Sequence, residues 1–117
     1  MKPLIPRKLL ALATLGIAAA AFSATSSAAP DADAAMALAK KNDCLKCHAI
    51  DKTKKAPSYK KIAEKYKGKA DGQQKVIDNI TKGAKVKLED GTEEDHKIIG
   101  TKDPKELKNL ADWILAQ

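Results

Sequence analysis

The stretch Cys44-Leu45-Lys46-Cys47-His48 contains both cysteines of the chain and one of its two histidines. Two thiols three positions apart can each form a thioether bond to one haem, and the histidine that follows is then placed to bind the iron. The same residues could also form a redox-active disulfide, a structural disulfide, or a zinc site completed by His96. A structural disulfide gives no role to His48, and a zinc site needs all four side chains. The motif therefore favours a covalently attached haem.

The chain begins with the features of a secretory signal peptide, which we predict to be residues 1–29. Positive residues precede an apolar run from Leu9 to Phe22, and small residues follow it. The run is shorter than the roughly 20 residues that a spanning helix needs, so we expect cleavage and no stable membrane insertion. We expect the mature domain, residues 30–117, in an oxidising compartment, the periplasm.

Composition limits the size of the domain and the kind of partner it can bind. A chain of 117 residues fits one small domain, and an aromatic content of 3% leaves little large apolar surface to bury. The net charge of +7 decreases when the basic residues of the signal leave, which argues against nucleic acid as a partner. Residues 40–69 hold eleven lysines and three acidic residues, whereas residues 70–117 hold eight lysines and ten acidic residues. This uneven charge suits electrostatic docking to a partner protein.

Capping residues and hydrophobic periodicity predict four helices and no strand. Asp31 or Asp33 would cap the first helix, and Ser58 would cap the second. The third would lie between Gly72 and Gly83, the latter acting as its stop.

The last helix has the clearest signals, because Asp103-Pro104-Lys105-Glu106 combines an N-cap, a proline at N1 and a glutamate at N3. Trp113 and Leu115 are expected to flank its buried stripe. The stripe itself would consist of Leu107, Leu110, Ala111 and Ile114. Residues 84–102 show no strong periodicity, and a loop of that length is usually functional or disordered.

Residues 30–117 resemble a small bacterial class I cytochrome c with one haem. The resemblance rests on the amphipathic helix that leads into Cys44–His48, on Ala56–Tyr66, and on the closing Leu110–Leu115. It implies an all-α fold of about four helices wrapped around one covalent haem c. It also implies that the first and last helices cross and pack beside the haem.

The resemblance assigns roles to individual residues around the haem. Cys44 and Cys47 would form the two thioether bonds, and His48 would bind the iron from one side. The carbonyl of Pro57 would accept a hydrogen bond from His48, which sets the orientation and basicity of the imidazole.

The chain departs from this family at the second axial ligand. The family normally uses a methionine ahead of the last helix, but no methionine follows His48, and we expect Met36 to be a core residue. His96 lies 17 residues before Trp113, about where the family's methionine falls when the last helices are aligned. We therefore predict His48 and His96 as the metal ligands. The alternatives are an open sixth site or a lysine: Lys85, Lys87 or Lys97.

The resemblance implies a one-electron carrier, not an enzyme. Imidazole in place of thioether sulfur lowers the reduction potential, and the acidic residues around His96 would lower it further. Lysines near the haem motif would guide docking of redox partner proteins to the haem edge, and we expect the carrier to be a monomer. The alternative function is a haem protein that binds a gas, or a redox-enzyme component, with an open or displaceable sixth site.

Overall fold

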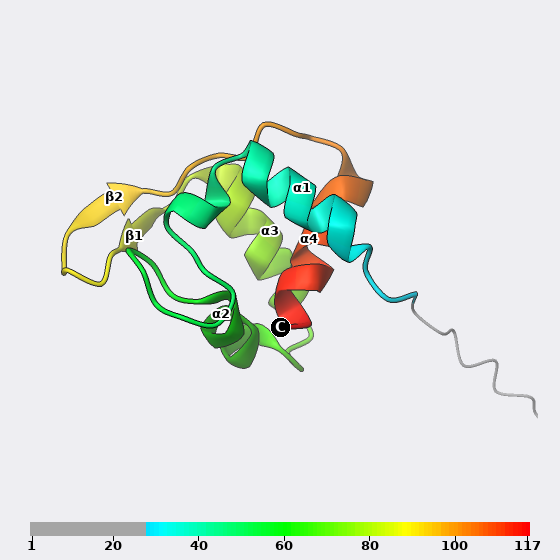
Figure 1. Cartoon of the computed structure of the whole chain (residues 1–117), viewed down its shortest axis with the longest axis horizontal. Helices are drawn as coiled ribbons and strands as arrows, with labels where there is room; N and C mark the ends of the chain where they lie inside the picture. Colours follow the sequence, from blue (N-terminus) through cyan, green and yellow to red (C-terminus); the bar gives the residue numbers. More distant parts are fainter. Residues whose placement is uncertain (1–27) are drawn as a thin grey trace, which may run out of the picture.

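The computed structural model describes residues 28–117 and is shown in Figure 1. The predicted signal peptide lies outside these residues, apart from its last two positions. The elements are α1 (Ala32–Lys41), a 3-10 turn (Cys44–Lys46), α2 (Tyr59–Tyr66), α3 (Gly72–Lys82), β1 (Lys85–Lys87), β2 (Glu93–Asp95) and α4 (Pro104–Leu115). The predicted all-α class with four helices is confirmed. Within residues 28–117, no helix has both the length and the apolarity to cross a membrane.

Side-chain caps determine where the helices begin. The Asp31 carboxylate accepts a hydrogen bond from the backbone N–H of Ala34 at 2.9 Å, so Asp31 rather than Asp33 caps α1. Ser58 Oγ accepts one from the N–H of Lys61 at 3.2 Å at the start of α2. Each cap satisfies a backbone donor that has no partner within its own helix.

Asp103 caps α4 as predicted, but Glu106 does not complete the cap. Asp103 accepts a hydrogen bond from the N–H of Lys105 at 2.9 Å. Glu106 does not close a capping box with the Asp103 N–H, because that N–H donates to Thr101 Oγ1 at 3.1 Å. The Thr101 hydroxyl in turn donates to the Glu106 carboxylate.

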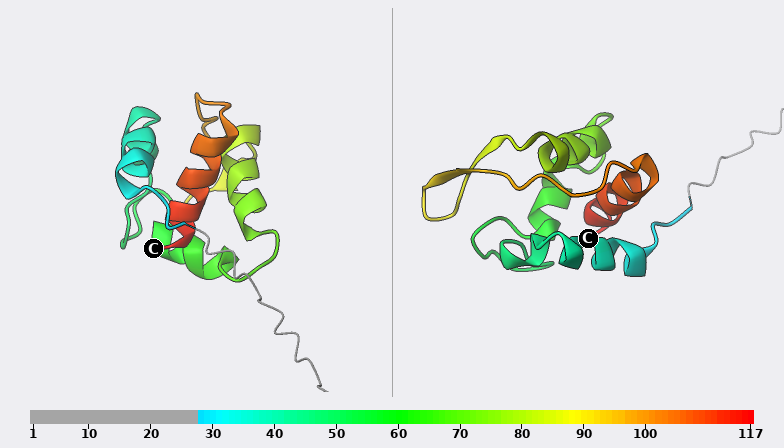
Figure 2. Two further views of the ribbon diagram at one scale, coloured as in Figure 1. Left: turned by 90° about the vertical axis from the view of Figure 1, so that its right-hand side faces the viewer. Right: turned by 90° about the horizontal axis from the view of Figure 1, so that it is seen from above.

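Helices α1 and α4 cross and pack against each other, as Figures 1 and 2 show. Ala35 and Ala39 of α1 are fully buried, and their small side chains allow a close approach. Asn109 of α4 also closes a reciprocal pair with Asp31. Its Oδ1 accepts from the Asp31 N–H at 2.8 Å, and its Nδ2 donates to the Asp31 carbonyl at 2.9 Å.

Helix α4 is the centre of the hydrophobic core, and α2 and α3 pack on it as well. Its predicted stripe is buried in full, and Trp113 is buried too rather than flanking the stripe. The Trp113 ring meets the Tyr59 ring edge-on, with 5.5 Å between centroids. Met36 packs against this core, as expected.

The prediction that the chain contains no strand is wrong. β1 and β2 form an antiparallel hairpin in which Lys85 pairs with Asp95 and Lys87 pairs with Glu93. These cross-strand pairs bring opposite charges together, which stabilises the pairing. Strands of three residues are too short to show a hydrophobic alternation in the sequence. The hairpin extends away from the helices in Figure 1, and the N–H of Glu89 at its tip donates to the carbonyl of Lys55 at 3.1 Å.

Candidate haem-binding site

Cys44 begins the 3-10 turn that follows α1, and Cys47 comes directly after that turn. The Cys44 carbonyl accepts hydrogen bonds from the N–H groups of Cys47 at 3.3 Å and His48 at 3.0 Å, which bends the motif into a single turn. Both thiols are half-buried and are not joined to each other by a disulfide. Burial raises the pKa of the Cys44 thiol, which keeps the free thiol protonated at neutral pH. The turn places both sulfurs on one cavity.

That cavity has a volume of about 730 Å³ and is bordered by Cys44, Cys47, His48, Pro57 and His96. Its size is within the range of cofactor pockets. Most of its other walls are apolar and come from α3, α4 and the segments beside β1 and β2. They include Val76, Ile80, Val86, Leu88, Ile99, Leu110 and Ile114. An apolar cavity that carries two thiols and two imidazoles fits a haem bound through thioethers and axial histidines.

His48 is oriented for metal binding by the loop before α2. Its Nδ1 lies 2.7 Å from the carbonyl oxygen of Pro57. Because a carbonyl only accepts, Nδ1 carries the proton and Nε2 remains free to bind a metal. Burial lowers the pKa of His48, although the bond to Pro57 opposes this effect, so the neutral ligand form is favoured at neutral pH. The Tyr59 ring stacks on the imidazole with 5.3 Å between centroids.

His96 lies directly after β2 and faces the same cavity. Its Nδ1 lies 2.9 Å from the carbonyl of Lys97, which again leaves Nε2 free. The centroids of the His48 and His96 rings are 6.2 Å apart, with an angle of 42° between the ring planes. An imidazole nitrogen binds a first-row metal at about 2 Å, so two rings on opposite sides of one ion have centroids roughly 6.4 Å apart. The fold brings the two histidines to this spacing although they are 48 positions apart in the sequence.

The other candidate sixth ligands are placed differently. Lys85 pairs with Asp95 at 3.2 Å, and Lys97 pairs with Asp43 at 2.9 Å, so both ammonium groups are engaged by carboxylates. Lys87, from β1, and Lys97 both border the cavity. Met36 is not among the residues that line it.

The zinc and disulfide interpretations of the motif gain no support. Among residues 28–117, no group of three or more His, Cys, Asp or Glu side chains is arranged to hold a metal ion. Cys44 and Cys47 remain separate thiols.

Two residues that border the site, Asn42 and Asp43, were not predicted from the sequence. Asn42 and Asp43 directly precede Cys44, border the cavity, and contact the segment that follows His96. Asp43 adopts the left-handed conformation with φ of +58°. Asn and Asp are the non-glycine residues that tolerate this conformation best, and an Asn-Asp pair after a helix was the available signal.

Comparisons with known proteins identify the family. The family model described as Cytochrome c matches residues 32–117. Cytochrome c-551 of Pseudomonas denitrificans is 30% identical over 78 residues, which cover 67% of this chain and 90% of that protein. Cytochrome c-551 of Allochromatium vinosum is 36% identical over 55 residues, which cover 47% of this chain and only 58% of that protein.

Solved structures agree with the sequence comparison. The class 1 cytochrome MtoD from Sideroxydans lithotrophicus ES-1 is 56% identical, with a TM-score of 0.72, covering 75% of this chain and 97% of that one. Wild-type cytochrome c552 of Nitrosomonas europaea is 31% identical, with a TM-score of 0.54, covering 68% of this chain and 95% of that one. Members of this family carry electrons and are not enzymes. The chain described above therefore belongs to the cytochrome c family, as a small class I member with one covalently bound haem c.

Proposed function

We propose that the chain is a one-electron carrier whose haem iron is held by His48 and His96. The observation that carries this proposal is the pair of imidazoles with centroids 6.2 Å apart beside one apolar cavity. Both rings engage Nδ1 with a backbone carbonyl, so each has Nε2 available as a ligand. When bound, the haem supplies a reversible ferrous–ferric couple.

The protein's part is to hold the cofactor and to close the iron to other ligands. Cys44, at the start of the 3-10 turn, and Cys47, directly after it, would form the thioether bonds. Pro57 keeps His48 in the tautomer that presents Nε2, and its carbonyl makes the ligand a better electron donor. With His96 as the sixth ligand, no position is open to a gas or a substrate, which suits electron transfer rather than binding chemistry.

We expect a reduction potential below that of family members with a methionine ligand. Imidazole donates more electron density than a thioether and stabilises ferric iron. Glu94 and Asp95 border the cavity next to His96, and their negative charge acts in the same direction. Solvent screening weakens the effect of these charges, because both residues are exposed.

The proposed docking surface is the rim of the cavity. Lys46, Lys61 and Lys65 are exposed and border the cavity on the side of the cysteine turn and α2. They would attract an acidic redox partner in a transient complex whose rate decreases with ionic strength. We place the carrier in the periplasm as a monomer, on the basis of its predicted signal peptide and of this exposed, charged rim.

The test is the ligand state of the purified holoprotein. We expect the ferric protein to be low-spin, and the ferrous protein not to bind carbon monoxide. The His96→Ala variant should become high-spin and bind carbon monoxide rapidly, whereas His96→Met should have a raised midpoint potential. Met36→Leu is the matched control and should leave the spectrum unchanged. Rapid stoichiometric binding of carbon monoxide by the wild-type protein would instead support the ligand-binding alternative.

A further inference from the structure

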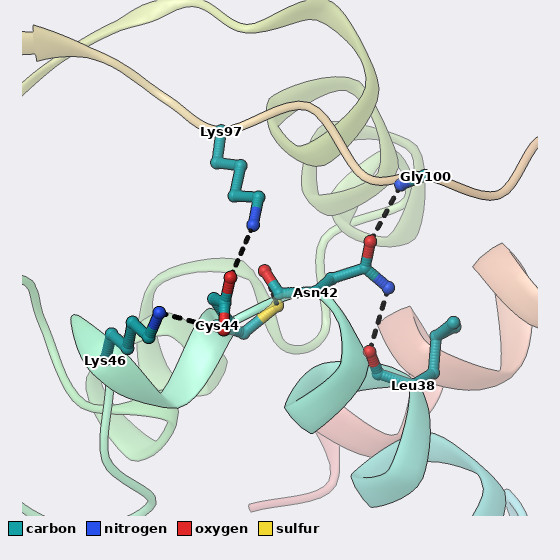
Figure 3. A network of polar contacts seen from close by, with 7 residues as sticks. Leu38, Asn42, Cys44, Lys46, Lys97 and Gly100 are labelled. Atoms are coloured by element: carbon teal, nitrogen blue, oxygen red, sulfur yellow. Dashed lines mark hydrogen bonds and ion pairs between the residues drawn. The ribbon is translucent and has the colours of Figure 1, made fainter.

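The side chains of Asn42 and Asp43, just after α1, reach the segment that follows His96. Figure 3 shows Asn42 with Gly100 and Leu38. Asp43 Oδ2 accepts an ion-pair hydrogen bond from Lys97 Nζ at 2.9 Å. Asn42 Oδ1 accepts a hydrogen bond from the backbone N–H of Gly100 at 2.8 Å. These contacts connect positions more than 50 residues apart in the sequence.

Asn42 is itself fixed in place. Its Nδ2 donates to the Leu38 carbonyl at 2.9 Å, and its backbone N–H donates to the same carbonyl at 3.1 Å. The side chain is thus anchored on the last turn of α1 before it accepts from Gly100. Cys44 follows two positions later, so the anchor lies beside the point where the haem is attached.

We propose that Asn42 and Asp43 are positioning residues for the sixth iron ligand. They tie the segment 97–100 to the chain that bears the haem, and they thereby hold the His96 imidazole against the iron. This inference rests on the proposed function, in which His96 is that ligand. Asn42 and Asp43 border the cavity but are not iron ligands in this role, and they act through the backbone on the carboxyl side of His96.

The chain on both sides of His96 is mostly exposed, so few buried contacts hold this residue in place. On its amino side is the hairpin, whose strand residues Glu93–Asp95 are all exposed. The His96 N–H donates to the Ala84 carbonyl at 3.0 Å, at the base of that hairpin. On its carboxyl side, Ile98 is 59% exposed, and the first buried residue is Ile99. Exposed elements with few buried contacts open most easily, so the ligand needs a second support.

That second support is shared between α3 and the end of α1. The Ile99 N–H donates to the Ile80 carbonyl at 2.8 Å, which joins the segment to α3. Asp43 joins Lys97, and Asn42 joins Gly100, to the chain just before the cysteine turn. The contacts with Ala84 and Ile80 connect the segment to the hairpin and to α3. The contacts with Asn42 and Asp43 connect it to the residues that directly precede the cysteine turn.

The experiment measures how fast added imidazole replaces His96 in the ferric holoprotein, by stopped-flow absorption. Asn42→Ala should accelerate the replacement by about tenfold, because a hydrogen bond to a backbone N–H is lost. Asp43→Asn and Lys97→Gln should each accelerate it by about threefold at low salt, since exposed ion pairs contribute little. Asn tolerates the left-handed backbone of Asp43, so this variant removes the charge without adding strain.

Two features separate positioning from general destabilisation. Asp43 also pairs with Lys46 at 3.1 Å, so the double variant Asp43→Asn/Lys97→Gln should be no faster than Asp43→Asn alone. The effect should disappear at about 1 M salt, where screening is strong. The control is Lys82→Gln, which removes an exposed ion pair of the same 2.9 Å length within α3 and should leave the replacement rate unchanged. Thermal unfolding of each variant is recorded in parallel.

The outcomes are distinct. If the wild-type protein is low-spin with His96 bound, but all three variants exchange at the wild-type rate, the positioning role is wrong and the proposed function stands. If His96→Ala has the wild-type spectrum, His96 is not the ligand, and both the proposed function and the positioning role are wrong. If Asn42→Ala does not fold, the surface variants at Asp43 and Lys97 decide the question alone.

Discussion

Gly83 ends α3 in the left-handed conformation, with φ of +64°. An added Cβ would lie 2.9 Å from Ile98 Cγ1, in addition to the strain of that backbone conformation. We expect Gly83→Ala to lower the free energy of unfolding by roughly 2–3 kcal/mol, measured by urea denaturation of the holoprotein.

Gly91 provides the matched control for this change. Its φ is +86°, but a Cβ there would meet no atom within 4 Å. Gly91→Ala should therefore cost only the backbone strain, about 1 kcal/mol. Equal losses for the two variants would show that the contact with Ile98 contributes nothing.

The carboxyl group of Asp43 makes a pH-dependent contribution. Hydrogen bonds from Lys97 and Lys46 lower its pKa below the ordinary value of 3.8. A carboxyl with a lowered pKa in the folded state stabilises the fold above its unfolded pKa, and this contribution is lost as pH falls through the folded value. The stability difference between wild type and Asp43→Asn should thus be constant from pH 7 to about pH 5. This difference in the free energy of unfolding, measured by chemical denaturation, should vanish below the pKa of Asp43 in the folded protein. A difference that persisted there would contradict the stabilising role of the Asp43 carboxylate.

The residues of the site differ in how far the sequence could predict them. The haem attachment motif is local, because its spacing alone encodes the chemistry. The prediction of His96 as the second iron ligand rested on the absence of a methionine after His48 and on its distance from Trp113. The 6.2 Å between the His48 and His96 rings joins positions far apart in the chain, and a local sequence pattern does not predict such a distance.

The crossing of α1 and α4 depends on small side chains at the contact. Ala39 is 0% exposed, so a larger side chain has no room without moving a helix. We expect Ala39→Leu to destabilise the holoprotein by about 1–3 kcal/mol in chemical denaturation.

Ala37 tests this expectation on the same helix. It is exposed, and Ala37→Leu adds the same atoms with nearly the same helix propensity. Its free energy of unfolding should stay within about 0.5 kcal/mol of wild type. A similar loss at both positions would place the cost in the helix itself rather than in the crossing.

The helices could be predicted because their signals are local. Asp31, Ser58 and Asp103 cap the helices that they precede in the sequence, and the α4 stripe follows from periodicity. The burial of Trp113 could not be predicted, since it depends on where Tyr59 lies in the fold. The hairpin escaped prediction because its pairing is made by charged residues in very short strands.

The helices and the hairpin border an open cavity of about 730 Å³, and we therefore expect the apoprotein to be poorly ordered. Without haem, the apolar side chains that line it lose most of their contacts, and the aromatic content of 3% offers little replacement. The variant Cys44→Ala/Cys47→Ala cannot form the thioether bonds. Prepared free of haem, it should show reduced helical circular dichroism and a larger hydrodynamic radius than the holoprotein. A compact and fully helical variant would show that the polypeptide folds without its cofactor.

The contacts of Tyr59 have an optical consequence. Its ring stacks on His48 and meets Trp113, so one aromatic ring separates the single tryptophan of the chain from His48. A haem at this distance accepts excitation energy efficiently. The Trp113 fluorescence of the native holoprotein should therefore be almost fully quenched. The Trp113 fluorescence should increase only when α4 separates from the cysteine turn. This fluorescence therefore reports unfolding without an added probe.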